Sequence, residues 1–397
     1  MIVAVLFAVL RPALAQVPPI GPDETLVFED TFDDFNFSVW KHELTLSGEG
    51  NWEFGERSRG PRTRRDQAHI MSNATLTCAR TFPPPHKTEM YVNNRTVSNV
   101  RNGSLVITPR FTNATIGDAG LASADVNIWG GDPSTLCTGN EFYGCEREGG
   151  AGGNIVNPIQ SARIRTAESF AFKYGRVEVV AKLPRGDWLW PAVWLMPVAS
   201  RYGGWPASGE IDILESKGNA RGAPGGGCES FGSTLHWGPF WPENGYLKTH
   251  EEFALPAGDL SEAFHTYGLL WNATRMQTYI DGSIVLDVAV NQSFWSLGAF
   301  GAGLADPWEG RGNNAPFDQR FYLIINLAVG GTNGFFPDGL GDGKPWANTA
   351  PHAANDFWGA VDSQWGPTWT SPSLAVDSVR VWQKAEEGGD YAYRLML

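Results

Sequence analysis

Cysteine is scarce in this chain, and long apolar runs are nearly absent. The 397 residues include four cysteines, Cys78, Cys137, Cys145 and Cys228. They form neither a C-x-x-C pair nor the His/Cys spacing of a zinc site, so the sequence predicts no transition-metal centre. No amphipathic helical period extends over a long stretch, and no segment is long and apolar enough to span a membrane. These absences favour a β protein.

Positive charge is also in deficit. The chain has 30 Lys and Arg against 43 Asp and Glu, a net charge of −13. Because nucleic acids and anionic membrane surfaces attract basic proteins, we expect neither as a partner. A neutral polysaccharide is indifferent to this charge.

Glycine, proline and tryptophan, by contrast, are abundant. The 47 glycines and 26 prolines supply many turns, and the 17 tryptophans provide aromatic faces that can pack in a core or stack on sugar rings. The length fits one large β-sandwich with long loops, and it does not require a second domain.

The first 15 residues are typical of a secretory signal peptide. Ile2 to Leu10 is a short apolar run, and Ala13-Leu14-Ala15 is a small-x-small cleavage site, although the usual basic start is missing. We therefore expect a secreted, extracellular protein, with Cys137 and Cys145 able to close a small disulfide loop; three pairings of the four cysteines remain open. Sequons for N-glycosylation agree with secretion; they begin at Asn36, Asn73, Asn94, Asn102, Asn113, Asn272 and Asn291.

The segment from Ser208 to Ser216 places three carboxylates, Glu210, Asp212 and Glu215, in apolar, β-prone sequence. Side chains alternate along a strand, so Glu210 and Asp212 share a face and Glu215 has the wrong parity. One extra residue, absorbed in a β-bulge near Ile213 or Leu214, brings Glu215 to the same face. Three acids on one face raise the pKa of at least one of them.

Such a cluster suits retaining glycoside hydrolysis. That reaction uses a nucleophilic carboxylate and an acid/base carboxylic acid roughly 5–5.5 Å apart. The alternative is a solvated strand face that carries charges by chance. The sequence around the acids makes the chance explanation less favoured than the catalytic one.

Four further motifs surround the acids: Tyr174 to Glu178, Gly186 to Pro197, Gly203 to Pro206 and Ser233 to Gly238. Their order resembles glycoside hydrolase family 16, and within it the animal endo-1,3-β-glucanases and β-1,3-glucan recognition proteins. The resemblance runs from about Leu26 to Gln383. It implies an all-β fold, an antiparallel β-sandwich of the jelly-roll, concanavalin A-like type, with a glycan cleft on the concave sheet.

The resemblance also implies roles for the acids. Glu210 is expected to be the ionised nucleophile and Glu215 the protonated acid/base, and Asp212 tunes the pair by hydrogen bonding and charge. The E-x-D-x-x-E spacing looks like the bulged laminarinase branch of the family rather than the unbulged lichenase form.

Five side chains are candidates for substrate binding: Trp205, Trp190, His236, Arg176 and Asn157. Trp205 resembles the family tryptophan that stacks at the cleavage subsite, and His236 the histidine that lines the cleft, although a lone histidine is structural at least as often. Arg176 and Asn157 could bind glucose hydroxyls, and Arg176 could equally pair with Glu178.

Other aromatic and amide residues are weaker candidates. Trp194 shares a strand face with Trp190 by its even spacing, and Trp190 is the better candidate for the cleft. Trp237 has the parity of a core residue. Gln319 and Asn326 are the least supported.

Several segments alternate or are continuously apolar and are predicted to be strands. They are Leu26–Phe32, Asn51–Phe54, Met90–Arg95, Ser104–Thr108, Ser161–Arg165, Tyr174–Leu183, Phe321–Leu327 and Val376–Trp382, with a hairpin turn at Asp281-Gly282. We expect a catalytic domain over residues 16–384 and a tail without pattern over 385–397. The arginine- and proline-rich residues 55–89 interrupt the resemblance, as a surface-loop insertion or a gene-model artefact.

The sequence therefore predicts a secreted, monomeric, retaining endo-hydrolase of β-1,3-glucans such as laminarin. No cofactor is required, and a structural calcium ion is neither indicated nor excluded. A β-1,3-glucan recognition protein of innate immunity that binds without cutting is the alternative; such relatives often lack one or both glutamates. A lectin-like adhesion module also fits the fold and the tryptophans, but it does not need the acids.

Overall fold

Two large antiparallel sheets form the molecule, in a computed structural model that describes residues 15–47, 89–131, 135–140, 142–341 and 343–385. The first has eight strands in the order β18-β17-β16-β11-β20-β5-β4, with β1 also paired to β20. Their bounds are β1 Glu24–Asp30, β4 Ser98–Arg101, β5 Ser104–Ile107, β11 Gly175–Lys182, β16 His265–Trp271, β17 Arg275–Ile280, β18 Ser283–Ala289 and β20 Leu374–Lys384.

The second sheet has seven strands in the order β15-β14-β13-β12-β19-β10-β2. Their bounds are β2 Lys41–His42, β10 Arg163–Arg165, β12 Leu189–Pro197, β13 Glu210–Ser216, β14 Ser230–His236, β15 His250–Ala254 and β19 Phe321–Val329. Every residue of β19 is buried, as expected for a central strand that is covered on both faces.

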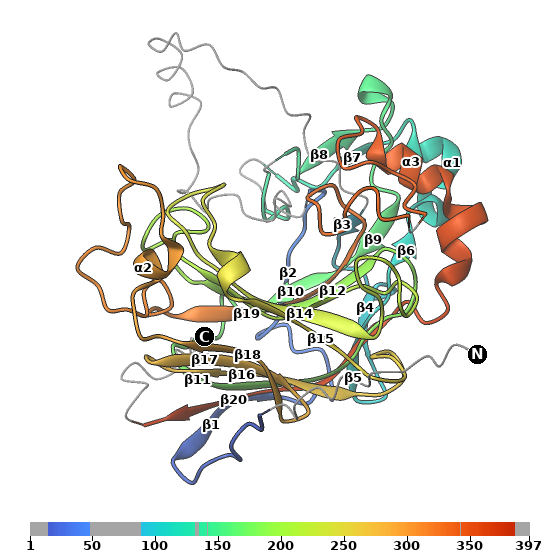
Figure 1. Cartoon of the computed structure of the whole chain (residues 1–397). Helices are drawn as coiled ribbons and strands as arrows, with labels where there is room; N and C mark the ends of the chain where they lie inside the picture. Colours follow the sequence, from blue (N-terminus) through green and yellow to red (C-terminus); the bar gives the residue numbers. More distant parts are fainter. Residues whose placement is uncertain (1–14, 48–88, 132–134, 141, 342, 386–397) are drawn as a thin grey trace, which may run out of the picture.

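Smaller elements lie around the seven-stranded sheet, on the side away from the eight-stranded one (Figure 1). They are the sheet of β3 Glu89–Tyr91, β6 Arg110–Phe111 and β9 Ile159–Ser161, the ribbon of β7 Asp125–Asn127 and β8 Glu146–Glu148, and the helices α1 Asn113–Leu121, α2 Phe294–Gly298 and α3 Ala353–Gly359. Among the described residues, no helix has the length and apolar character needed to cross a bilayer.

The main core lies between the two large sheets. Alternate residues of β11, such as Val177 and Val179, pack in one cluster with Val193 of β12 and Ile211 of β13. This alternation is the period of a strand with one face inward, and it fixes which side chains of each sheet point outward. We call the outward face of the seven-stranded sheet the carboxylate face, because it carries the three acids.

The predicted all-β antiparallel sandwich is confirmed. Strands occur at each predicted segment that the structure describes. Asp281 and Gly282 both have positive φ angles, 48° and 80°, as the two central residues of a type I′ hairpin turn require. The predicted signal peptide, the strand at Asn51–Phe54, nearly all of the 55–89 segment and the C-terminal tail lie outside the described residues.

The disulfide between Cys137 and Cys145 is present, with Cα atoms 5.5 Å apart. Its loop packs against the segment before residue 48, since Leu46 donates its backbone N–H to Gly144 at 2.7 Å. Of the described cysteines, Cys228 is unpaired and buried.

Candidate active site

A β-bulge in β13 determines the geometry of the three acids. Against β12, Leu214 pairs with Val193 and Asp212 with Trp194, so Ile213 has no partner of its own. Against β14, Asp212 pairs with Thr234 and Glu215 with Gly232, which leaves two residues of β13 opposite one of β14. The predicted bulge at Ile213 and Leu214 is confirmed.

The consequence of the bulge is visible in the burial of the strand. Ile213 and Leu214 are consecutive, yet both are fully buried in the main core together with Ile211. Regular alternation allows only one of two neighbours to point inward, so the bulge resets the parity. Glu215 is therefore half-buried on the same face as Glu210 and Asp212, which are 3% and 2% exposed.

Glu210 is the acid whose proton affinity is most clearly perturbed. Burial raises the pKa of Glu210 well above its usual value, and the charges of Asp212 and Glu215 raise it further. Trp205 donates its indole N–H to Oε2 of Glu210 at 2.6 Å and acts in the opposite direction, because it stabilises the carboxylate. The expected role of Glu210 as the ionised nucleophile stays a prediction.

Glu215 contacts a different tryptophan. Trp190 donates its indole N–H to Oε1 of Glu215 at 3.1 Å. The ring of Trp190 is 6% exposed and stacks on Phe335, with centroids 3.9 Å apart and planes 4° apart. The expected role of Trp190 as a sugar-stacking surface is therefore corrected: Phe335 covers the ring, and the N–H is the part that reaches the acids.

Asp212 contacts His236. His236 lies directly opposite Glu210 in the β13–β14 ladder, and its Nε2 is 3.3 Å from Oδ2 of Asp212. Among the described residues, Glu210, Asp212 and His236 are the one group whose donor atoms lie close enough together to hold a metal ion. His236 thus lies beside the acids, and its predicted role in lining the glycan cleft stays a prediction.

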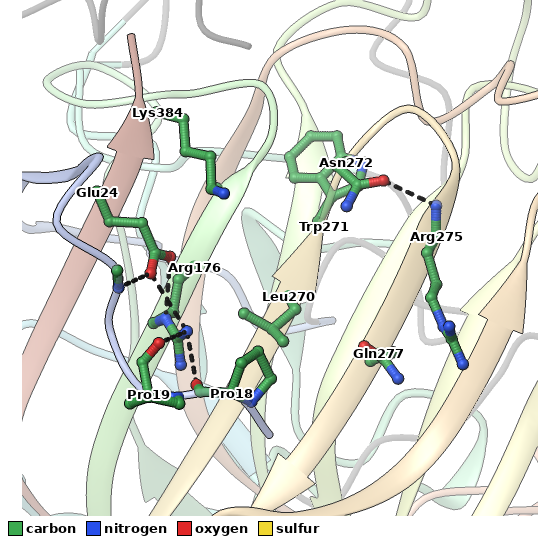
Figure 2. Close-up of a pocket in the computed structure, with 12 residues that line it drawn as sticks. Pro18, Pro19, Glu24, Arg176, Leu270, Trp271, Asn272, Arg275, Gln277 and Lys384 are labelled. Carbon is green, nitrogen blue, oxygen red and sulfur yellow. Dashed lines mark hydrogen bonds and ion pairs between the residues drawn. The ribbon is translucent and has the colours of Figure 1, made fainter. Parts of the chain in front are cut away.

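Arg176 does not belong to this site. It lies on β11 of the eight-stranded sheet, and because its neighbour Val177 is a core residue, its side chain points to the outer face of that sheet. Nε of Arg176 is 3.1 Å from Glu24, and Nη2 donates to the carbonyl of Pro18 at 2.9 Å (Figure 2). The alternative pairing with Glu178 is present at 3.8 Å.

The cavity around Arg176, about 340 Å³ in volume, lies on the sheet that does not carry the acids (Figure 2). Its three cationic side chains each have a carboxylate partner, in the pairs Arg176–Glu24, Arg275–Asp287 and Lys384–Asp23. These pairs neutralise its charge, and we assign it no part in the candidate site.

Asn157 is also corrected, to a structural residue. It is 1% exposed, and its Nδ2 donates to the carbonyls of Leu46 at 2.9 Å and Glu89 at 2.6 Å. Its Oδ1 accepts from Arg147 at 3.3 Å. The side chain is committed to holding chain segments together rather than to a ligand.

The weaker candidates support the site without being part of it. Gln319 donates to the carbonyl of Ser208 at 3.0 Å, just before Glu210. Asn326 accepts from the indole of Trp194 at 2.7 Å. Trp237 is fully buried, as predicted.

Sequence reasoning missed three residues of the segment that follows β14. Trp241 is 47% exposed, and its ring centroid is 5.5 Å from that of Trp205. The ring of Tyr246 stacks on His236 at 5.2 Å, and Asn244 contacts the same imidazole at 2.9 Å. The aromatic run Phe240-Trp241-Pro242 was the available signal, since exposed aromatics in a loop often mark binding surfaces.

Comparison with known proteins identifies the family of the chain. Residues 153–300 match the model of glycosyl hydrolases family 16. The beta-1,3-glucan-binding protein of Penaeus monodon is 44% identical over 367 residues, which cover 90% of this chain and 90% of that protein. The glucan endo-1,3-beta-glucosidase of Cryptopygus antarcticus is 35% identical over 218 residues, covering 52% of this chain and 72% of that protein.

Among solved structures, the catalytic domain of an endo-1,3-beta-glucanase (laminarinase) from Thermotoga petrophila RKU-1 has a similar fold, with a TM-score of 0.54. The two are 21% identical, and the match covers 91% of this chain and 99% of that one. At this identity the solved structure shows only that the fold is similar. The family is shown by the sequence relatives, above all by the 44% identical protein of Penaeus monodon. The chain belongs to glycosyl hydrolases family 16.

Proposed function

We propose that this protein is a secreted endo-hydrolase that cleaves β-1,3-glucosidic bonds with retention of configuration. The observation that supports the proposal best is the bulge of β13, which brings Glu215 to the face of Glu210 with Asp212 between them. Retaining hydrolysis needs two such carboxyl groups in different protonation states. The disulfide between Cys137 and Cys145 is in keeping with an oxidising, extracellular compartment.

In the proposed mechanism, Glu215 protonates the leaving oxygen while Glu210 attacks the anomeric carbon. The reactive form is the one in which the proton of the cluster is on Glu215 and the Glu210 carboxylate accepts the Trp205 N–H. The attack forms a glycosyl-enzyme ester. Water, deprotonated by the now ionised Glu215, then releases the sugar and regenerates both acids.

The substrate surface that we propose is the pair of rings Trp205 and Trp241. They lie side by side with an angle of 30° between their planes, next to the carboxylate of Glu210. Pyranose rings have apolar faces that pack on indoles, and the remaining exposed area of Trp241 offers such a surface. This pair takes the place of the predicted pair Trp205 and Trp190.

A second candidate function is binding of β-1,3-glucan without cleavage. It is favoured by the name of the Penaeus monodon relative, whose similarity extends over 90% of the chain. Both functions use the same face, so the presence of the acids and aromatics does not by itself separate them. The discriminating property is turnover.

The test compares wild-type protein with the Glu210→Gln variant on laminarin, measuring both bound polysaccharide and released reducing ends. We expect the wild type to release products and the variant to bind laminarin while losing at least about 10³-fold in rate. Binding by both proteins without products from either supports the second candidate. Equal product release by both contradicts the assignment of Glu210.

A further inference from the structure

Asn244, in the segment after β14, has an amide orientation that its neighbours determine. Its Oδ1 accepts the backbone N–H groups of Trp237 at 3.3 Å and Tyr246 at 3.2 Å. Because a backbone N–H can only donate, the oxygen must lie on that side and the NH₂ group on the other. The NH₂ group therefore faces Nδ1 of His236, at 2.9 Å.

This orientation fixes the tautomer of the imidazole. The amide nitrogen of Asn244 has hydrogens to donate and no lone pair to offer, so Nδ1 of His236 must be the acceptor. A neutral imidazole with an unprotonated Nδ1 carries its hydrogen on Nε2. Nε2 is the atom that lies 3.3 Å from Oδ2 of Asp212.

Oδ2 of Asp212 is an oxygen that needs a hydrogen-bond donor. Asp212 is 2% exposed, and its Oδ2 has no hydrogen-bond partner of good geometry among the residues that the structure describes; Nε2 of His236 lies beside it, at 3.3 Å. A buried carboxylate oxygen without a donor is costly, and an N–H on the neighbouring ring nitrogen is more favourable there than a second lone pair. The ring itself is held by Tyr246, stacked at 5.2 Å, and by Trp205 at 5.6 Å, which opposes reorientation.

We propose that Asn244 is a positioning residue that holds His236 in the Nε2–H tautomer, so that the imidazole donates to Asp212 and cannot ligate a metal ion. A metal needs the Nε2 lone pair, and this tautomer has replaced it with a hydrogen. The three side chains Glu210, Asp212 and His236 thus form a proton-handling cluster, although their spacing also suits a cation. The catalytic consequence rests on the proposed function; the tautomer and the exclusion of metal do not.

The deciding variant is Asn244→Asp. A carboxylate keeps the oxygen that accepts the two backbone N–H groups, and it replaces the donor facing Nδ1 with a second acceptor. The hydrogen is then drawn to Nδ1, and Nε2 loses its role as a constitutive donor. Asn102→Asp is the matched control, because Asn102 is exposed in the hairpin between β4 and β5 of the other sheet.

The primary measurement is the ¹⁵N NMR spectrum of the histidine ring nitrogens at alkaline pH, with the His236→Gln spectrum providing the assignment. We expect protonated Nε2 and bare Nδ1 in the wild type and the Asn102→Asp control, and protonated Nδ1 in Asn244→Asp. A wild-type spectrum with the hydrogen on Nδ1 overturns the proposal, whether or not the protein cleaves laminarin. So does a spectrum of Asn244→Asp that is the same as the wild type.

Zinc binding, measured by titration calorimetry, is the second readout. We expect no stoichiometric Zn²⁺ site in the wild type and a gain of at least about tenfold in affinity in Asn244→Asp, lost again when His236→Gln is added. Stoichiometric zinc binding by the wild type that His236→Gln abolishes contradicts the proposal. If laminarin is cleaved, we expect Asn244→Asp to lower kcat about tenfold and to change KM little, because the aromatic surface is untouched.

Discussion

At the scale of single residues, each acid of the cluster lies beside a different ring nitrogen. Trp205 donates to Glu210, Trp190 donates to Glu215, and His236 contacts Asp212. The Trp205 N–H lowers the pKa of Glu210, against the raising effects of burial and of the neighbouring carboxylates. In the proposed reaction, this donor favours the ionised form that Glu210 needs as a nucleophile.

Trp205→Phe tests the effect of this donor. The indole N–H favours the ionised form of Glu210, so its loss is expected to raise the pKa of Glu210 further. The acid limb of the pH profile of kcat/KM on laminarin should move to higher pH, and activity near neutrality should fall about tenfold, the cost of a charge-assisted hydrogen bond. An acid limb that stays in place or moves to lower pH contradicts the role of this donor.

At the scale of elements, the bulge of β13 matters more than any one side chain of the strand. Because of the bulge, Ile213 and Leu214 have no paired residue in β14, and both side chains lie in the core. In return, an acid of the wrong parity reaches the carboxylate face. Local irregularity of this kind is common beside functional sites, where it re-aims a side chain.

Deletion of Ile213 removes the extra residue and restores regular alternation. Leu214 then occupies the inward position of Ile213, and Glu215 stays on the carboxylate face, so we expect the variant to keep measurable hydrolysis, with a lower melting temperature because one buried apolar side chain is lost. The control is Ile213→Val, which should cost about 0.5–1.5 kcal/mol and keep activity. A folded deletion variant without any hydrolysis argues against parity as the reason for the bulge.

The segment after β14 supplies the second element-scale test. Trp241→Ala, made in the Glu210→Gln background so that no substrate is consumed, should weaken laminarin binding about tenfold, as expected for an exposed aromatic anchor. Leu247→Ala is the control, because Leu247 is apolar and 75% exposed in the same region. Equal affinity of the two variants excludes Trp241 as a binding surface.

Residue order alone predicted much of this element-scale picture. The parity of Glu210, Asp212 and Glu215 was sufficient to require a bulge, because alternation along a strand is a local rule. Whether a ring is exposed depends on non-local packing, so the covering of Trp190 by Phe335, far along the chain, could not be foreseen.

The errors on Arg176 and Asn157 have a related cause. The alternation over Tyr174–Leu183 predicted that Arg176 lies in a strand, but not in which of the two sheets, because sheet membership is set by long-range pairing. The amide of Asn157 suits a sugar hydroxyl or a backbone carbonyl equally well. Its burial, which only the fold determines, selects the carbonyls of Leu46 and Glu89.

At the scale of the whole molecule, the outward faces of the two sheets carry different kinds of side chains. The eight-stranded sheet closes the core and carries paired charges on its outer face, such as Arg176 with Glu24. The seven-stranded sheet carries the acids, with helices and small sheets around it (Figure 1). The fold thus supports a cluster of buried acids that is unfavourable for its own stability.

The stability of the protein should reflect that cost. The pKa of Glu210 in the folded protein is raised above the value of 4.5 expected when unfolded, so the folded state holds this proton more tightly. The contribution of Glu210 to stability is therefore greatest below about pH 4.5 and is lost as the pH rises through its folded pKa. Glu210→Gln removes this titration, so its melting temperature should exceed that of the wild type by a margin that grows from pH 4.5 upward. A margin that shrinks with rising pH contradicts a raised pKa.

The central claim is that Glu210 and Glu215 act on opposite sides of one glucosidic bond in a double displacement. The most direct test follows the anomeric protons by ¹H NMR during the first minutes of laminarin cleavage, before mutarotation equilibrates the products. We predict that the β-anomer of the new reducing ends appears first and that the α-anomer follows only by mutarotation. Early appearance of the α-anomer, or no new reducing ends at all, would contradict the account.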